Sequence, residues 1–346
     1  MKRQVKREKG SILEPRFTNE DAAREWLENM RWPDGAVCPH CGLVGEAYRV
    51  TVKGNVEGKT EKEIQDMRKA KIRIRRPRKG VWACAGCRQQ FSVTVKTIFE
   101  DSHIPLHKWL LAFHLINASK KGMSAHQLMR MLDIKQYKSA WFMAHRIRYA
   151  MTGELPEQMN GIIEADEAFI GGKAKNKSKS IRAQRSLALR PGTRQDVPSV
   201  VADKAAVFTV LQRGGRVHSR HIEKVTADNL KAVIGEVCAA DAHLMTDTGV
   251  LAKALKNRKH SLVNHRADEY VRFDEGVCVT TNTVEGYFSL LKRGINGVYH
   301  HVGRKHLHRY LAEFDFRYNA REMTDGERGL EALKGVEGKR LMYRDS

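Results

Sequence analysis

Hydrophobic residues in the first half of the chain recur at the three- and four-residue spacing of amphipathic helices. One such helix is expected over residues 17–30, with Thr18 or Asn19 as its N-cap. Three more helices are expected between residues 104 and 152. Residues 90–95 alternate between polar and apolar side chains, which predicts a strand.

From residue 162 onwards the pattern changes to short apolar strands that alternate with helices. Strands are expected at residues 162–172, 205–211, 217–225, 242–247 and near 262–263. Helices are expected at residues 227–238, from 250, from 281 and from 304. The turn Arg213-Gly214-Gly215-Arg216 would join the second and third strands as a hairpin. This order predicts an α/β fold in which helices flank a mixed sheet.

Composition adds a strong positive charge to this picture. The 346 residues, enough for about two to three domains, include 62 Lys and Arg against 40 Asp and Glu, a net charge of +22. Such an excess favours a polyanionic partner, and nucleic acid is the first candidate. A membrane surface is the rival partner, but the chain has no apolar run of about 18 residues and its basic start lacks an apolar segment behind it. We therefore expect a cytoplasmic, nucleoid-associated protein with no membrane contact.

The cysteine spacing indicates a metal site. Two C-x-x-C pairs are formed by Cys38, Cys41, Cys84 and Cys87. Such pairs place four thiolates around one tetrahedral ion, which predicts a structural Zn²⁺. The basic segment 50–80 between the pairs is interpreted as an elongated ribbon or loop. The alternatives are four reduced core cysteines, or His40 as a ligand in place of one of them.

The helices between residues 104 and 152 have the pattern of a helix-turn-helix. A short helix is followed by a turn and a longer basic helix, which places Gln136, Tyr137 and Lys138 at the end that would enter a DNA groove. The alternative is a small helical bundle, since Arg146 and Arg148 on the longer helix could equally be solvated.

Three acids stand in the first strand of the second half, where acids are otherwise scarce. With a period of two, Glu164 and Asp166 share one face of the strand while Glu167 lies on the other. Asp247 follows at the carboxyl end of a later buried strand, where open α/β sheets keep their sites. A pocket of carboxylates around a cation is favoured over a solvated strand face.

The helix expected from residue 281 leaves two interpretations open. Asn282 and Glu285 are three residues apart at its start, so Glu285 could bond to the Asn282 amide in a capping box. Glu285 could instead be a metal ligand, with Lys292 two turns further along the same face to meet a phosphate.

Several sequence blocks, in this order, resemble those of the ISXO-like zinc-ribbon transposases of prokaryotic insertion sequences, which are DDE recombinases. The blocks are CPHCG, CRQQFSVTVKTIFEDSHIPLHKW, IEADEAFIGGK, RGGRV, MTD, TNTVEGYFSLLKRGINGVYHHV and KHLHRYLAEFDFRYN. The resemblance covers most of the chain and implies an RNase H-like catalytic domain, binding of terminal inverted repeats, and a metal-bound acidic triad.

Residue by residue, the resemblance assigns the first catalytic acid to Asp166 and the second to Asp247. Both Asn282 and Glu285 match the family's pattern at the third position. The basic segment between the cysteine pairs and the Lys-rich stretch that follows Gly172 depart from the family by their length. DNA contacts of that stretch, including Lys173, are inferred from charge alone.

The chain is accordingly divided into four parts. They are an N-terminal helix and zinc ribbon at 1–100, a helix-turn-helix-like DNA-binding segment at 101–155, an RNase H-like catalytic domain at 156–322 and a polar tail at 323–346.

The expected function is a DNA transposase that binds the ends of its insertion sequence. Cleavage and strand transfer would use Mg²⁺ or Mn²⁺ held by Asp166, Asp247 and Glu285, with Lys292 and Arg293 near the DNA. The partners would be double-stranded DNA and further copies of the chain. No G-x-x-x-x-G-K-[ST] motif for ATP occurs. The alternatives are a non-catalytic DNA-binding protein derived from a transposase, and a nuclease of the same fold that cuts without joining.

Overall fold

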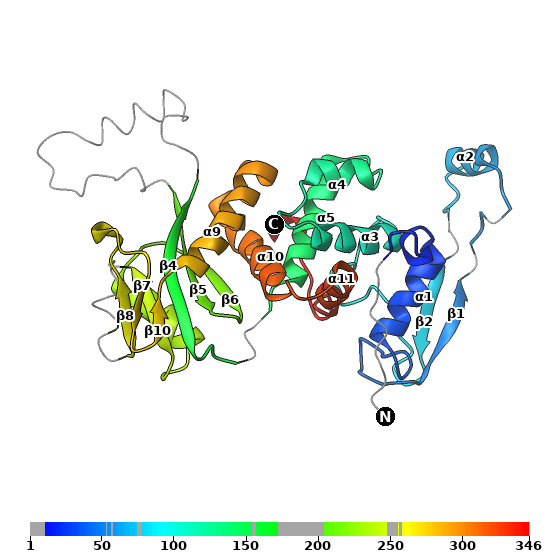
Figure 1. The fold of residues 1–346 in the computed structure, drawn as a ribbon. Coiled ribbons are helices and arrows are strands. Elements are labelled where there is room, and N and C mark those ends of the chain that lie inside the picture. The colour runs from blue at the N-terminus through cyan, green and yellow to red at the C-terminus, as the bar shows by residue number, and fades with distance from the viewer. Residues whose placement is uncertain are drawn as a thin grey trace, which may run out of the picture.

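A small sheet at one end of the molecule and a larger mixed sheet at the other are joined by a helical segment (Figure 1). The structure is a computed structural model that describes residues 11–345 apart from 53, 57, 75–77, 154–156, 172–203, 248–254 and 256–257. The basic stretch 173–194 lies outside these residues. The helix expected from residue 250 lies largely outside them. Short 3-10 turns occupy Pro15–Phe17, His265–Ala267, Arg304–His306 and Tyr343–Asp345.

The N-terminal part combines one helix with a three-stranded antiparallel sheet. Helix α1 (Glu20–Arg31) is capped by Asn19, which accepts hydrogen bonds from the backbone of Asp21 and Ala22, so Asn19 rather than Thr18 is the N-cap. The sheet consists of β1 (Ala47–Val52), β2 (Arg78–Cys84) and β3 (Gln90–Phe91). Helix α2 (Glu61–Lys69) stands between β1 and β2 and buries none of its residues. The segment between the cysteine pairs is therefore a ribbon, as predicted, with an added helix.

The helical segment contains the three helices that the sequence predicts. They are α3 (Leu106–Ala118), α4 (Ala125–Met131) and α5 (Tyr137–Ala150). Helix α11 (Asp325–Lys334) returns to pack against α3. Leu333 and Val336 lie in the same buried cluster as Trp109. The expectation of a polar tail after residue 322 is therefore wrong, because the apolar face of α11 completes this core.

The mixed sheet has the strand order β6-β5-β4-β7-β8. Its strands are β4 (Ile162–Ile170), β5 (Ala205–Gln212), β6 (Val217–Ile222), β7 (His243–Asp247) and β8 (His260–Val263). Strand β4 is antiparallel to β5 and parallel to β7, so it lies at the centre of the sheet where the strand direction changes. The predicted α/β fold with a mixed sheet is confirmed.

Helices cover both faces of this sheet, and the alternation along β4 divides the core between them. Ile163 and Ala165 pack on α7 (Ala227–Val237). Ala168 and Ile170 pack on α9 (Asn282–Gly294) and α10 (Leu307–Asn319). Residues with the parity of Glu164 and Asp166 therefore face α9.

The connection into α9 is a short hairpin, β9 (Arg272–Asp274) and β10 (Val277–Val279). After α9 the chain makes one π-turn at Ile295–Tyr299 before α10. Among the described residues, no helix is both long and apolar enough to cross a membrane.

A buried ion cluster fixes the helical segment to α10. Arg148 of α5 donates to Glu313 of α10 over 2.5 Å, Arg317 donates to the same carboxylate, and the Tyr299 hydroxyl donates to it over 2.6 Å. Arg146 donates to the backbone carbonyls of Leu341 and Glu100. The interpretation of Arg146 and Arg148 as solvated is therefore wrong, because both guanidinium groups have internal acceptors.

Candidate active site and metal centres

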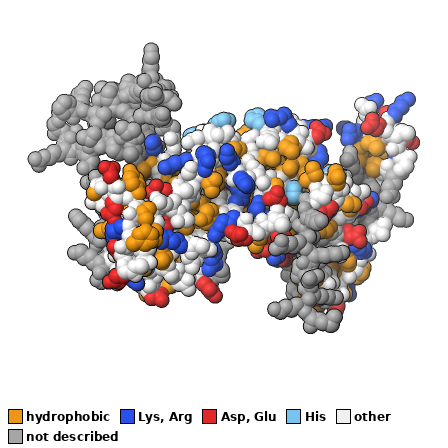
Figure 2. All heavy atoms as spheres, in the orientation of Figure 1, with side chains coloured by type: hydrophobic (Ala, Val, Ile, Leu, Met, Phe, Trp, Pro, Cys, Tyr) orange, Lys and Arg blue, Asp and Glu red, His pale blue; other side chains and the backbone are white. Residues whose placement is uncertain are grey.

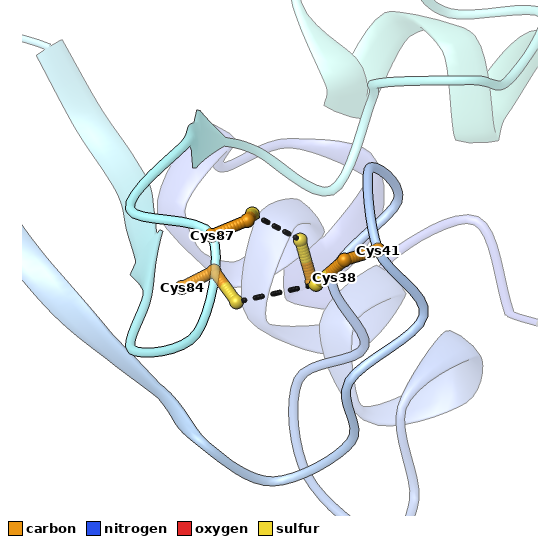
Figure 3. Close-up of side chains that lie close together, drawn as sticks. All are labelled: Cys38, Cys41, Cys84 and Cys87. Atoms are coloured by element: carbon orange, nitrogen blue, oxygen red, sulfur yellow. Dashed lines mark hydrogen bonds between the residues drawn. The ribbon is translucent and has the colours of Figure 1, made fainter.

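The four cysteines converge on one point between two tight turns (Figure 3). The Sγ atoms of Cys38 and Cys87 are 3.6 Å apart, as are those of Cys41 and Cys84. A tetrahedral zinc with Zn–S bonds of about 2.3 Å requires S···S separations of about 3.8 Å. The cluster therefore fits Zn²⁺, and the predicted convergence of the four cysteines is confirmed. His40 is exposed and outside the cluster.

The backbone of the first turn prepares a thiolate for the metal. Burial opposes ionisation of Cys38, but the N–H groups of Cys41 and His40 outweigh it and lower the pKa of Cys38 to about 6. The turn needs Gly42, whose φ of +81° lies in the left-handed region. The thiolate is the form that binds zinc, so local backbone geometry and metal binding favour the same state.

A second cluster forms at the edge where β4 and β7 part. Asp166, Glu167 and Asp247 place carboxylate oxygens within 4.8 Å of one another. Strand β4 pairs with β7 only over Ile162–Ala165, and Asp247 ends β7, so Asp166 lies just beyond the last paired position. Glu167 has the opposite parity along β4, yet its carboxylate also reaches this cluster. The structure thus brings Asp166 and Asp247 together, as expected, and adds Glu167 to them.

These carboxylates resist ionisation in the absence of a cation. Burial, followed by the charges of Asp247 and Glu285, raises the pKa of Asp166 to about 6 against the opposing effects of the Glu167 N–H and Lys292. Burial and the charges of Asp166 and Asp247 raise the pKa of Glu167 to about 7. Crowded carboxylates that share a site favour a divalent cation, because its charge would offset both the burial of the carboxylates and their mutual repulsion.

Glu285 stands beside this cluster on the first turn of α9. Its carboxylate accepts a hydrogen bond from Thr281 Oγ1 over 3.1 Å and lies 3.3 Å from His265 Nε2. It is not among the three acids that converge within 4.8 Å, but its charge contributes to the raised pKa of Asp166. His265 was not predicted from the sequence, because a single histidine after a short strand carries no signal of its own.

The capping box expected between Asn282 and Glu285 is absent from α9. The N-cap is Thr281, and the Asn282 amide donates to Thr280 Oγ1 over 3.2 Å. The capping interpretation is therefore wrong for this pair, which removes the main structural explanation for the carboxylate of Glu285.

Glu164, two residues before Asp166, performs the capping instead. This fully buried carboxylate accepts hydrogen bonds from the backbone N–H groups of Thr283 and Val284 over 2.8 and 3.0 Å. Arg213, from the hairpin between β5 and β6, donates to Glu164 over 2.7 Å and to the carbonyls of Cys278 and Thr280. A negative charge at a helix N-terminus is stabilising. Glu164 and Arg213 thus fix the start of α9, and with it Glu285, against the central strand.

Comparison with known proteins agrees with these two centres. Residues 158–319 match the ISXO2-like transposase domain, and residues 18–60 match the transposase zinc-ribbon domain. The predicted resemblance to the ISXO-like zinc-ribbon transposases is confirmed by these two matches. A relative described as an uncharacterized protein in transposable element ISH50 of Halobacterium salinarum is 25% identical over 328 residues, which cover 92% of this chain and 96% of the relative.

One solved structure also aligns with this chain. It is a chain of the simian T-cell lymphotropic virus intasome in complex with the PP2A regulatory subunit B56 gamma, with 13% sequence identity. The alignment covers 60% of this chain and 65% of that chain, and its TM-score of 0.26 is too low to carry an argument.

The described side chains that are expected to contact DNA lie on two exposed helix faces. Gln136, Tyr137 and Lys138 are exposed at the start of α5, where the Tyr137 ring stacks on His126 at 4.3 Å. Lys292 and Arg293 are exposed on α9. Lys and Arg side chains gather over α9 and α10 in Figure 2. The remaining candidate, Lys173, lies outside the described residues.

Proposed function

We propose that this chain is a DNA transposase that binds the ends of its insertion sequence and catalyses metal-dependent strand cleavage and strand transfer. The observation that carries the proposal is the meeting of Asp166 and Asp247 at one sheet edge, with Glu285 held beside them. Family membership supports a transposase-related DNA-binding protein, and the carboxylate cluster supports the step from binding to chemistry.

The proposed ligands suit Mg²⁺ or Mn²⁺, which prefer carboxylate oxygen and retain bound water. Two such ions would activate the attacking hydroxyl and stabilise the leaving oxygen of an in-line displacement at phosphorus. In this proposal Asp166 and Asp247 would hold the ions, and Glu285 would be a further ligand or would orient a water molecule. Lys292, whose charge acts on Asp166, would lie against a neighbouring phosphate.

The proposed DNA surface extends from the carboxylates to the helical segment. Lys292 and Arg293 would contact the strand near the cleaved bond, and Gln136, Tyr137 and Lys138 would enter a groove of double-stranded DNA. Lys173 would add a phosphate contact. Joining two ends requires both to be held at once, so we propose a homo-oligomer in the active complex.

The decisive experiment incubates the purified protein with DNA carrying the ends of its element in Mg²⁺. We expect 3′-end cleavage and joined products from the wild type and neither from Asp247→Asn, while both proteins bind the DNA alike. Glu322→Gln, which changes an acid on the surface far from the carboxylates in sequence, is the matched control and should stay active. Binding without cleavage by the wild type would favour the non-catalytic alternative, and cleavage without joined products would favour a nuclease.

A further inference from the structure

A basic pocket with aromatic walls lies where α9, α10 and α11 meet the end of the helical segment. Its volume is about 310 Å³. The residues that line it are Lys120, Tyr287, Leu290, Phe314, Arg317, Tyr318, Arg321 and Arg328. Four of these side chains are cationic and none is acidic. Neither the zinc centre nor the carboxylate cluster accounts for this concentration of charge.

Arg317 gives the pocket a cation with unused donors. Its side chain is only 6% exposed, and one nitrogen donates to Glu313, but its Nε and Nη2 atoms are buried without a hydrogen-bond partner. Unpaired buried donors of a charged group are costly, so their presence points to an acceptor that binds there.

Glu313 supplies only one acceptor to Arg317 and is shared with a second guanidinium group. Burial opposes ionisation of Glu313, but Arg317 and Arg148 outweigh it and lower the pKa of this carboxyl to about 2. The other buried acid nearby, Asp315, accepts hydrogen bonds from Tyr287 and Ser219 instead. A phosphate oxygen at the pocket would supply the acceptor that the remaining donors of Arg317 lack.

The aromatic wall suits a base next to that phosphate. The Arg321 guanidinium lies 4.5 Å from the centre of the Tyr318 ring, and the rings of Tyr318 and Tyr287 meet edge to face at 5.5 Å. Stacking on aromatic rings and on arginine is how proteins hold unpaired bases without reading their sequence. The volume is near the lower end of the range for small-ligand pockets, about 300–1,000 Å³, and fits one nucleotide rather than a double helix.

Helix α9 connects this pocket to the carboxylates. Leu290, at the pocket, and Glu285, at the carboxylates, lie on opposite edges of the exposed face of α9, with Gly286 and Ser289 between them. A β-carbon at Gly286 would meet nothing within 4 Å, so no packing inside the chain explains a glycine there. The width of a helix is about 10–12 Å.

We infer that this pocket binds the phosphate and base of an unpaired nucleotide in a DNA strand that crosses α9 from the carboxylate cluster. The inference rests on the proposed function, because it assumes that DNA is the substrate at those carboxylates. The phosphate would accept from Arg317, Arg321 and Lys120, and the base would lie against Tyr318.

The test compares two labelled probes by fluorescence anisotropy in buffer without Mg²⁺ or Mn²⁺: a blunt duplex, and the same duplex with a short single-stranded overhang. The wild type should prefer the overhang probe. Tyr318→Leu and Arg321→Gln should each weaken binding of that probe about tenfold and leave the blunt duplex unchanged. Lys231→Gln is the matched control, because Lys231 is exposed on α7, which covers the opposite face of the sheet. This variant should alter the affinity for neither probe. If Tyr318→Leu does not fold, the affinities of Arg321→Gln and Lys120→Gln for the two probes still test the inference, because both side chains lie at the surface.

Equal affinity of the wild type for both probes, or unchanged overhang affinity in the variants, would overturn the inference. A free deoxynucleoside monophosphate that stabilises the wild type while the variants keep full overhang affinity would reassign the pocket to free nucleotides and also overturn it. A photoreactive base in the overhang should crosslink to Tyr318. Because Mg²⁺ and Mn²⁺ are left out while the structural zinc stays bound, these results do not depend on cleavage. A protein that fails to cleave would contradict the proposed function and leave this measurement intact.

Discussion

The two metal centres of this chain are built in opposite ways. Each half of the cysteine cluster comes from a single turn, in which two ligands three residues apart are fixed by local backbone hydrogen bonds. The carboxylates come from β4, β7 and the start of α9, which approach only when the sheet and its covering helix have formed. Local spacing therefore identifies the first centre, whereas the second depends on the fold.

The centres also differ in what they leave for chemistry. Four thiolates fill a tetrahedral shell and leave no position for water or substrate, so the zinc should be structural. Carboxylates around Mg²⁺ leave several positions to water, as catalysis requires. The comparison predicts that losing the zinc centre costs fold stability, whereas losing a carboxylate costs activity alone.

The largest expected effect is loss of the zinc. Cys84→Ser should lower the zinc content from about one per chain to near zero and unfold the N-terminal part, since structural zinc contributes about 10–16 kcal/mol in small zinc domains. Zinc content by atomic absorption and proteolysis of residues 11–100 would measure this. Cys278→Ser changes a cysteine outside the cluster and should retain both zinc and fold. A zinc-free protein with an intact N-terminal part would refute the structural role.

The second largest effect is a difference in stability between variants of two acids on β4. Glu164→Gln should destabilise the protein by about 3–5 kcal/mol, because it leaves Arg213 partly buried without its anion. Glu167→Gln should cost nothing or stabilise, since burial already disfavours the charge of Glu167. Urea unfolding of both variants tests the contrast. Equal stability losses would mean that Glu164 does not anchor α9.

These two acids also show the limits of the sequence. Alternation along β4 placed Glu164 and Asp166 on one face, and Asp247 was expected at the carboxyl end of its strand, because both rules depend on local pattern alone. The pairing of Glu164 with Arg213 could not be predicted, since it joins a strand, a hairpin and a helix start that are far apart in the chain. The burial of α11 was missed for a related reason, because its apolar face is short and its partner, α3, lies at the other end of the sequence.

A smaller effect, confined to activity, is expected at Glu285. Glu285→Gln keeps the size of the side chain and removes the charge that would bind a cation. Cleavage should fall by more than the roughly 10–100-fold typical of partners outside the ligand shell, while thermal stability stays within the error of the wild type. Glu322→Gln is the matched control, because the side chain of Glu322 is 90% exposed. An active Glu285→Gln would remove this residue from the metal site.

Metal and protons should compete at the carboxylates. Burial raises the pKa of Asp166 to about 6 and that of Glu167 to about 7, above their values in an unfolded chain. The folded state thus holds these protons more tightly. Without metal, the contribution of these groups to stability is full below about pH 4 and is lost as the pH rises to about 7.

Mg²⁺ should reverse that loss, so the rise in Tm that it causes should be larger at about pH 8 than at about pH 5. The double variant Asp166→Asn, Glu167→Gln should show almost no Mg²⁺ effect at either pH. Equal gains at both pH values in the wild type would place the metal away from these acids.

The smallest effect is expected at Asn282, the residue that competes with Glu285 for the third position. Asn282 is exposed on the first turn of α9 but is not its N-cap, and only its backbone amide has a partner, Thr280 Oγ1. Asn282→Ala should therefore change the free energy of unfolding by less than about 0.5 kcal/mol, as at ordinary surface positions, instead of the roughly 1 kcal/mol that a lost N-cap costs. Its cleavage rate should fall only partially, because the side chain faces solvent beside the carboxylates and not between them. Single-turnover cleavage by Asn282→Ala and Glu285→Gln at equal DNA occupancy gives the comparison. A folded but inactive Asn282→Ala together with an active Glu285→Gln would assign the third position to Asn282.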